Sequence, residues 1–137
     1  CRVVSDLDAA VSQAHIISCA TLARQPLIKG HLLQPGSHLD LVGAFTPEMR
    51  ESDDICVTRA RVFCDTRDGA LKEGGDLTDP IGRGVISTDD IQGDLFELCC
   101  GACAGRRSES EITLFKSTGT ALEDLAAAKL AFGRANV

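Results

Sequence analysis

The stretch that decides the fold is EITLFKSTGTALEDLAAAKLAF, which runs from Glu111 to Phe132. Its apolar run ITLF predicts a buried strand. The segment KSTG follows at once, and an alanine- and leucine-rich helix is expected over 120–134. A buried strand that passes through small and hydroxyl-bearing residues into a helix is typical of an α/β protein.

The same alternation of short apolar runs and helical stretches extends along the chain. Further strands are expected at 2–5, 15–21, 38–44 and 61–66. Helices are expected at 7–14, 51–60, 67–73 and 89–103, and an irregular segment at 76–85. Apolar strands that alternate with helices predict a parallel sheet with helices covering both faces.

Three strands of this predicted sheet end in small, polar or hydroxyl-bearing residues. Right-handed crossovers bring the carboxyl ends of parallel strands to one edge of the sheet, where open α/β sheets bind ligands. Small residues let a ligand approach the backbone, and hydroxyl groups and a lysine supply hydrogen bonds to it. One cleft is therefore expected to contain Cys19, Ala20, Thr21, Val42, Gly43, Ala44, Lys116, Ser117 and Thr118.

Composition excludes several classes of function. The 137 residues suit one domain, and the net charge of −6 argues against a nucleic-acid partner, because phosphate contacts need a basic face. No apolar run approaches the roughly 18 residues that a membrane helix needs. Seven cysteines are an odd number, and three of them lie within apolar runs, so we expect a reduced, cytoplasmic protein without disulfides.

The cysteines do not predict a metal site. Cys99, Cys100 and Cys103 form a C-C-x-x-C pattern on a predicted helix. A structural zinc ion needs four ligands, and no second Cys/His pair lies nearby in the sequence. Packing of this helix, with incidental thiols, is the interpretation that we prefer, and no metal is predicted.

A glycine-rich phosphate-binding turn of the type GxGxxG, placed between a strand and a helix, is absent from the sequence. The chain also begins with Cys1 rather than Met. We therefore expect a fragment whose sheet is incomplete and whose phosphate-binding half lies elsewhere.

Four segments, SCAT, LVGAFTPEMRESDD, ARVFCDTRDGALKEGGDL and EITLFKSTGTALEDLAAAKL, together resemble the ornithine cyclodeaminase/μ-crystallin family. The resemblance extends from about Asp6 to Ala131. It implies that 1–137 is the second part of a Rossmann-like NAD(P)-binding domain, and that the helix at 120–135 returns to a substrate domain. The first glycine-rich βαβ unit and the N-terminal substrate and dimerisation region would be missing.

The family resemblance also implies an activity, namely nicotinamide-dependent chemistry on small amino or imino acids. Cyclodeaminase-like members carry an Asp where this sequence has Phe45, and a phenyl ring cannot transfer a proton. The run Pro47 to Glu51 matches the ketimine reductases. The expected function of the parent protein is NAD(P)H-dependent reduction of a cyclic imine such as Δ1-pyrroline-2-carboxylate to proline, in a homodimer. Ornithine cyclodeaminase and a non-catalytic, NADPH-binding crystallin-type protein are the alternatives.

The resemblance assigns roles to the residues at the predicted edge. Glu73 and Lys116 are the candidate catalytic residues, although a solvated Glu and a Lys packed along its stem are the structural alternatives. Thr21 has the simpler alternative of closing its strand. The candidate substrate-binding residues are Phe45, Glu73 and Thr118. The candidate cofactor-binding residues are Cys19, Ala20, Thr21, Val42, Gly43, Ala44, Phe45, Lys116, Ser117 and Gly119.

Overall fold

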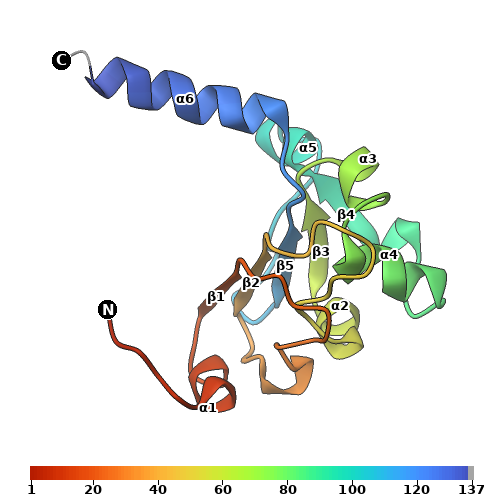
Figure 1. The fold of residues 1–137 in the computed structure, drawn as a ribbon. Helices are drawn as coiled ribbons and strands as arrows, with labels where there is room; N and C mark the ends of the chain where they lie inside the picture. Colours follow the sequence, from red (N-terminus) through yellow and green to blue (C-terminus); the bar gives the residue numbers. More distant parts are fainter. Residues whose placement is uncertain (136–137) are drawn as a thin grey trace.

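The computed structural model describes residues 1–135, which include a five-stranded sheet and the helices that pack against it (Figure 1). The strand order is β1-β2-β5-β3-β4, and every neighbouring pair is parallel. The predicted α/β class and parallel sheet are therefore confirmed. The strands are β1 (Ile16–Cys19), β2 (His38–Leu41), β3 (Arg61–Cys64), β4 (Ile91–Asp94) and β5 (Thr113–Lys116).

Short helices connect these strands, and side-chain caps start several of them. Asp6, Asp53, Thr66 and Asp94 each accept a hydrogen bond from a backbone N–H in the first turn of a helix, which satisfies a donor that has no partner within the helix. The α-helices are α1 (Leu7–Val11), α2 (Asp54–Arg59), α3 (Arg67–Ala70), α4 (Gly75–Gly82), α5 (Leu95–Cys99) and α6 (Ala121–Ala135); the 3₁₀ turns are η1 (Gly30–Leu32) and η2 (Thr88–Asp90).

One face of the sheet carries the hydrophobic core. Alternate residues of the strands, such as Leu39, Leu41 and Leu114, are fully buried there against residues of α1 to α4. The core is almost entirely aliphatic, as the scarcity of aromatic residues implies. Burying such side chains stabilises the fold by about 1.5–3 kcal/mol each.

The opposite face is covered unevenly, so the expectation of helices over both faces is only partly met. Residues of α5 and the segment after it, including Arg106, lie with Phe63 and Phe115 around an apolar cavity of about 250 Å³. Along β1, however, Ile16 is 72% exposed on this same face. The chain therefore leaves the β1 side of the sheet open.

The predicted helix at 89–103 is wrong over most of its length. Thr88 was expected to cap this helix, but Ser87 is the cap instead: Ser87 and Asp90 form a reciprocal capping box, which supports only the single turn η2. Ile91 then joins the sheet beside Val62 as the first residue of β4. Tertiary pairing of this short segment overrides the local helix signal, and α5 ends at Cys99 rather than at 103.

Three other expectations also need correction. Residues 76–85 are not irregular, because most of them belong to α4. Its residue Gly75 packs so tightly that an added Cβ would lie 2.0 Å from the Met49 carbonyl oxygen. Residues 2–5 form no strand within the described chain. The helix expected at 51–60 begins only at Asp54, so Glu51 precedes it rather than lying on its surface.

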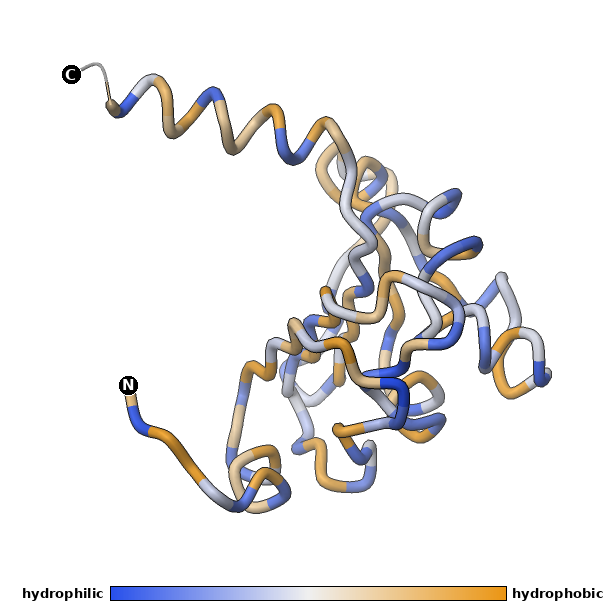
Figure 2. The backbone as a smooth tube through the Cα atoms, in the orientation of Figure 1, coloured by the Kyte–Doolittle hydropathy of each residue, from blue (hydrophilic) through white to orange (hydrophobic). Residues whose placement is uncertain are grey.

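The last helix, α6, projects away from the rest of the molecule (Figure 1). Hydrophobic and hydrophilic residues are interspersed along it, as Figure 2 shows. None of its residues is buried, and its large apolar side chains Leu122, Leu125, Leu130 and Phe132 are all more than half exposed.

Candidate functional site

The predicted strand ends meet at one edge of the sheet. A Cβ added at Gly43 would lie 2.1 Å from the carbonyl oxygen of Thr21, so the residues that follow β1 and β2 are in direct contact. The backbone N–H of Ser117 donates to the carbonyl oxygen of Leu41 at 2.9 Å, which places the end of β5 beside the end of β2. The expected meeting of the strand ends at one edge is confirmed, whereas the cleft expected there stays a prediction.

The predicted residues differ in how far they reach solvent at this edge. Ala20, Val42, Phe45 and Gly119 are exposed, whereas Thr21, Ser117 and Thr118 are half-buried. Cys19, Gly43, Ala44 and Lys116 are buried. The edge therefore presents small, apolar and hydroxyl-bearing residues.

Beneath the edge, the buried carboxylate of Glu51 joins the first two strand ends. Its Oε1 accepts hydrogen bonds from the backbone N–H of Thr21 at 2.6 Å and from the Thr21 hydroxyl at 2.7 Å. Its Oε2 accepts from the N–H groups of Gly43 and Ala44 at 2.9 and 3.4 Å. The side chain is completely buried, so these bonds satisfy a group that would otherwise be costly to remove from water.

A second buried carboxylate, Asp76, lies between Glu51 and Lys116. Its Oδ1 accepts from the backbone N–H groups of Glu51 and Ser52, and from the Ser52 hydroxyl, each at 2.9 Å. Its Oδ2 is 3.6 Å from the Lys116 ammonium nitrogen, and both side chains are inaccessible to solvent. Lys116 is therefore the buried counter-ion of Asp76.

This environment acts on the Lys116 ammonium in two opposing ways. Removal from water disfavours its charged form and lowers its pKa, and the carboxylates of Asp76 and Glu51 oppose that effect without cancelling it. The nitrogen has no hydrogen-bond partner within the described chain. The catalytic role of Lys116 stays a prediction, because its ammonium lies under the edge and not on its surface.

Asp65, at the end of the RVFCD run, was expected either at the edge or as a helix cap, and the structure places it at the edge. Thr66, not Asp65, caps α3. Asp65 Oδ2 accepts from the Ser117 hydroxyl at 3.0 Å and from the backbone N–H groups of Thr118 and Gly119, both at 2.7 Å. The end of β3 therefore holds the segment that follows β5.

Glu73 lies close to the same segment. At the next residue, Gly74, an added Cβ would lie 3.1 Å from Lys116 Cε and 3.3 Å from Thr118 Cγ2. The Glu73 side chain is exposed, so its carboxylate is available to a ligand. Its predicted catalytic role stays a prediction.

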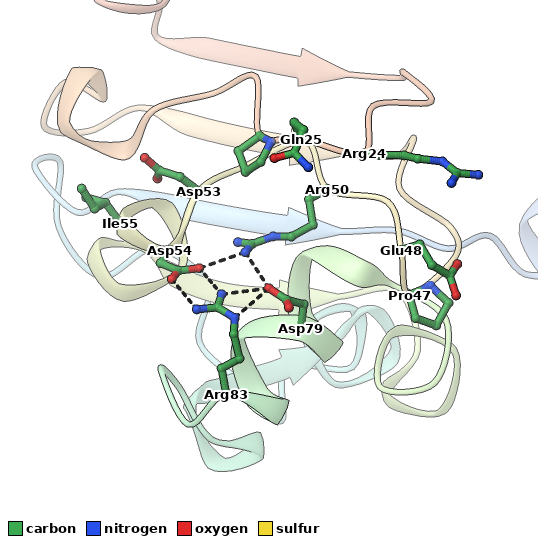
Figure 3. A pocket seen from close by; sticks show the side chains of 11 residues that line it. Arg24, Gln25, Pro47, Glu48, Arg50, Asp53, Asp54, Ile55, Asp79 and Arg83 are labelled. Carbon is green, nitrogen blue, oxygen red and sulfur yellow. Dashed lines mark hydrogen bonds and ion pairs between the residues drawn. The ribbon is translucent and has the colours of Figure 1, made fainter.

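A cavity of about 550 Å³ beside α2 and α4 does not include any of the predicted residues. Figure 3 shows that Arg50, Asp54, Asp79 and Arg83 form a network of ion pairs there, with contacts between 2.5 and 3.0 Å. Hydrogen bonds from Arg83 and Arg50 hold the pKa of Asp54 at about 2. Since each arginine contacts both aspartates, this network joins the start of α2 to α4.

The sequence did not single out Glu51 or Asp76, the two buried carboxylates beneath the edge. Glu51 was expected only as the first residue of a helix at 51–60, and Asp76 as part of an irregular segment. The one available signal was their neighbours: Glu51 follows the Pro-x-x-Arg run, and Asp76 follows two glycines that permit close packing.

Other features of the described chain add no further site. All seven cysteines are free of disulfides. Within residues 1–135, no group of three or more Asp, Glu, His or Cys side chains is arranged to hold a metal ion. No helix in that range has both the length and the hydrophobicity that a membrane crossing requires.

Comparisons with known proteins found a matching family and similar sequences. A model of the family described as "Ornithine cyclodeaminase/mu-crystallin family" matches residues 1–137. The Δ1-pyrroline-2-carboxylate reductase of Paracoccus denitrificans is 49% identical over 122 residues, which are 89% of this chain and 39% of that protein. The ketimine reductase mu-crystallin of Mus musculus is 39% identical over 131 residues, which are 96% and 39% of the two chains.

A solved structure is similar over nearly the whole chain. It is the Δ1-pyrroline-2-carboxylate reductase of Thermococcus litoralis in complex with NADH and L-proline, with a TM-score of 0.90 and 38% sequence identity. The match covers 96% of this chain and 41% of that one. The chain thus spans about two fifths of the length of the proteins that it matches.

Proposed function

Since the chain belongs to the ornithine cyclodeaminase/mu-crystallin family, we propose that it contributes the second part of the NAD(P)-binding domain of a ketimine reductase. The reaction is the NAD(P)H-dependent reduction of a cyclic imino acid such as Δ1-pyrroline-2-carboxylate to the amino acid. Because the chain spans about 40% of its relatives' length, the proposal concerns a polypeptide of their size. The phosphate-binding turn and the substrate domain belong to its remaining part.

The observation that carries the proposal is the shared edge formed by the ends of β1, β2 and β5. Ala20, Val42 and Gly119 are small or apolar and exposed there, and a Cβ added at Gly119 would meet no atom within 4 Å. These small and apolar residues fit the ribosyl-nicotinamide end of a dinucleotide. When bound, the nicotinamide would supply a hydride to the imine carbon.

The exposed residues around the edge would handle the substrate. We assign to Glu73 the role of holding a proton on the imine nitrogen, which makes the imine carbon more electrophilic. Phe45, which is 46% exposed, would pack against the ring of the substrate. Thr118 Oγ1 is buried and has no hydrogen-bond partner within the described residues, so we assign the contact of Thr118 with the substrate to its other atoms. The burial of Lys116 against Asp76 supports a positioning role at the end of β5.

The proposal also covers the cellular compartment and the oligomeric state of the protein. Seven cysteines without a disulfide support a reducing compartment, and we assign the protein to the cytoplasm. A homodimer is proposed for the full-length polypeptide, and a related archaeal alanine dehydrogenase is described as a dimer with bound NAD.

The test uses the longest natural polypeptide that contains this chain. Oxidation of NADPH and of NADH is measured with Δ1-pyrroline-2-carboxylate, and ammonia release is measured with ornithine and NAD. The proposal expects reduction of the imine. Ammonia release from ornithine without imine reduction would identify a cyclodeaminase, and dinucleotide binding without either reaction would identify a non-catalytic binding protein.

A further inference from the structure

Two buried carboxylates, Glu51 and Asp65, each bind a hydroxyl group at the edge. Glu51 is fully buried and Asp65 is 3% exposed. Glu51 accepts from the Thr21 hydroxyl at 2.7 Å, and Asp65 accepts from the Ser117 hydroxyl at 3.0 Å. Glu51 lies before α2, and Asp65 follows β3. They bind residues that follow β1 and β5, the two strands that flank β2 in the sheet.

The same carboxylate oxygens also accept backbone N–H groups, so their role as acceptors is fixed. Glu51 Oε1 accepts the N–H of Thr21 at 2.6 Å, and Asp65 Oδ2 accepts the N–H groups of Thr118 and Gly119 at 2.7 Å. A carboxylate has no hydrogen to give. Each of the two hydroxyl groups must therefore turn its single hydrogen inward, toward the buried acid.

The hydroxyl oxygens consequently face a ligand as hydrogen-bond acceptors. The Thr21 oxygen uses one lone pair for the N–H of Ala23 at 3.3 Å, which leaves one free. The Ser117 oxygen keeps both lone pairs. Both residues are half-buried at the edge, so part of each is open to a molecule that lies on it.

We propose that Glu51 and Asp65 are positioning residues that set the hydrogen-bond polarity of this edge, so that it selects a ligand group that donates. The inference rests on the proposed function and deepens it. A nicotinamide carboxamide and ribose hydroxyls are such donors. A group of the same shape that only accepts would leave the Thr21 and Ser117 oxygens without a partner, which weakens its binding.

A matched pair elsewhere in the sheet provides a control. The Ser18 hydroxyl donates to Asp40 Oδ2 at 2.6 Å, between the middle residues of β1 and β2. It is the same type of bond between a hydroxyl and a carboxylate, but it lies within the strands and on the exposed face of the sheet. Its loss should leave ligand selection at the edge unchanged.

The experiment compares two dinucleotides on the full polypeptide that contains this chain. One is whichever of NADH and NADPH binds the polypeptide more tightly. The other is its acetylpyridine analogue, in which a methyl ketone replaces the carboxamide and removes the N–H donor. Dissociation constants are measured by calorimetry for the wild type, Thr21→Val, Thr21→Ser, Ser117→Ala, the Thr21→Val/Ser117→Ala double variant and Ser18→Ala.

The wild type should bind the carboxamide about 3- to 10-fold more tightly than the analogue, which corresponds to one hydrogen bond. The double variant should reduce this ratio to about one, whereas Thr21→Ser and Ser18→Ala should retain it. These hydroxyl variants leave the backbone bonds of Glu51 and Asp65 in place, so the test does not depend on acid variants that would destabilise the fold.

Two results would count against the inference in distinguishable ways. An unchanged ratio in a double variant that still binds dinucleotide would overturn the assigned polarity while leaving the proposed function intact. A wild type that binds neither dinucleotide would overturn the proposed function and this inference together.

Discussion

At the scale of single residues, the sequence predicted the residues at the strand ends but not the buried carboxylates that bind them. Thr21, Ser117 and Lys116 stand directly after apolar runs, and parallel topology alone brings them together. Glu51 and Asp76 are buried because segments far apart in the sequence close over them. No local pattern of a single sequence distinguishes such a carboxylate from a solvated one.

The buried pair of Lys116 and Asp76 leads to a stability prediction. Replacing Lys116 with Met leaves Asp76 without its counter-ion, and the loss of one partner of a buried pair costs about 3–5 kcal/mol. Lys116→Met should lower the free energy of unfolding by that amount in chemical denaturation at neutral pH. Lys129→Met on the exposed surface of α6 is the control and should change it little. Equal effects of the two substitutions would contradict the account of the pair.

Three buried thiols predict how stability depends on alkaline pH. Burial raises the pKa of Cys19 and Cys64 from 9.0 to about 12, and it raises the pKa of Cys56 as well. Above pH 9 the unfolded chain therefore releases protons that the folded chain keeps, so stability must fall as the pH rises. The lowered pKa of Lys116 makes stability rise with pH below pH 10.5, but this is the effect of one group, whereas three thiols have the opposite effect.

The expected slope is about 1.4 kcal/mol per pH unit for each thiol that stays protonated, and denaturation at several pH values above 9 measures it. Cys64→Ala should remove roughly a third of the thiol contribution to this slope. Cys100→Ala, at an exposed thiol, is the control. The same slope in Cys64→Ala and in the wild type would show that this buried thiol is not a source of the pH dependence.

At the scale of elements, the contact between the ends of β1 and β2 depends on the absence of a side chain. A Cβ at Gly43 would lie 2.1 Å from the Thr21 carbonyl oxygen and 2.3 Å from its backbone nitrogen, so backbone would have to move. Gly43→Ala should destabilise the fold by about 1–3 kcal/mol and abolish dinucleotide binding by the full polypeptide.

A matched glycine in α6 serves as the control for Gly43→Ala. A Cβ at Gly133 would meet no atom within 4 Å, and alanine is a better helix former than glycine. Gly133→Ala should therefore not destabilise the protein. A Gly43→Ala variant with the stability and the dinucleotide affinity of the wild type would rule out the close contact as a constraint.

Because α6 is exposed, we predict that its amides exchange hydrogen faster than those of the sheet. Most of the stability of a helix in a protein comes from packing, and an isolated helix of 15 residues is marginal in water. For the 137-residue chain in solution, the amides of α6 should exchange much faster than those of β2 and β5, which have a strand on each side. Mass spectrometry of exchanged peptides measures this, and equal protection of α6 and β5 would mean that the helix is packed in solution.

The sequence predicted long, uniform elements better than short ones. The last strand and helix follow from a continuous apolar run and a long alanine-rich stretch. By contrast, β4 includes Gly93 and directly follows the capping box of Ser87 and Asp90, which is a helix signal. Its strand conformation comes from pairing with β3. The helix α4 was not predicted because Gly74 and Gly75 look like a loop signal, whereas in the structure they allow close packing at the start of the helix.

At the scale of the whole molecule, the described chain has one covered face, an open β1 side and no phosphate-binding turn. We therefore predict that the 137-residue chain alone binds NADPH weakly and reduces no imine. Calorimetry with NADPH tests the binding, and the full polypeptide that contains the chain is the control. Tight binding by the 137 residues alone would mean that the edge suffices without phosphate contacts.

The central claim is that the ends of β1, β2 and β5 hold a nicotinamide ring. A crystal structure of the full polypeptide with bound NADPH and proline tests it most directly. The account predicts that the ring lies against Thr21, Gly43 and Ser117, with the carboxylate of Glu73 beside the amino acid. A dinucleotide whose ring lies away from this edge, for example in the cavity beside Arg50 and Arg83, would contradict it.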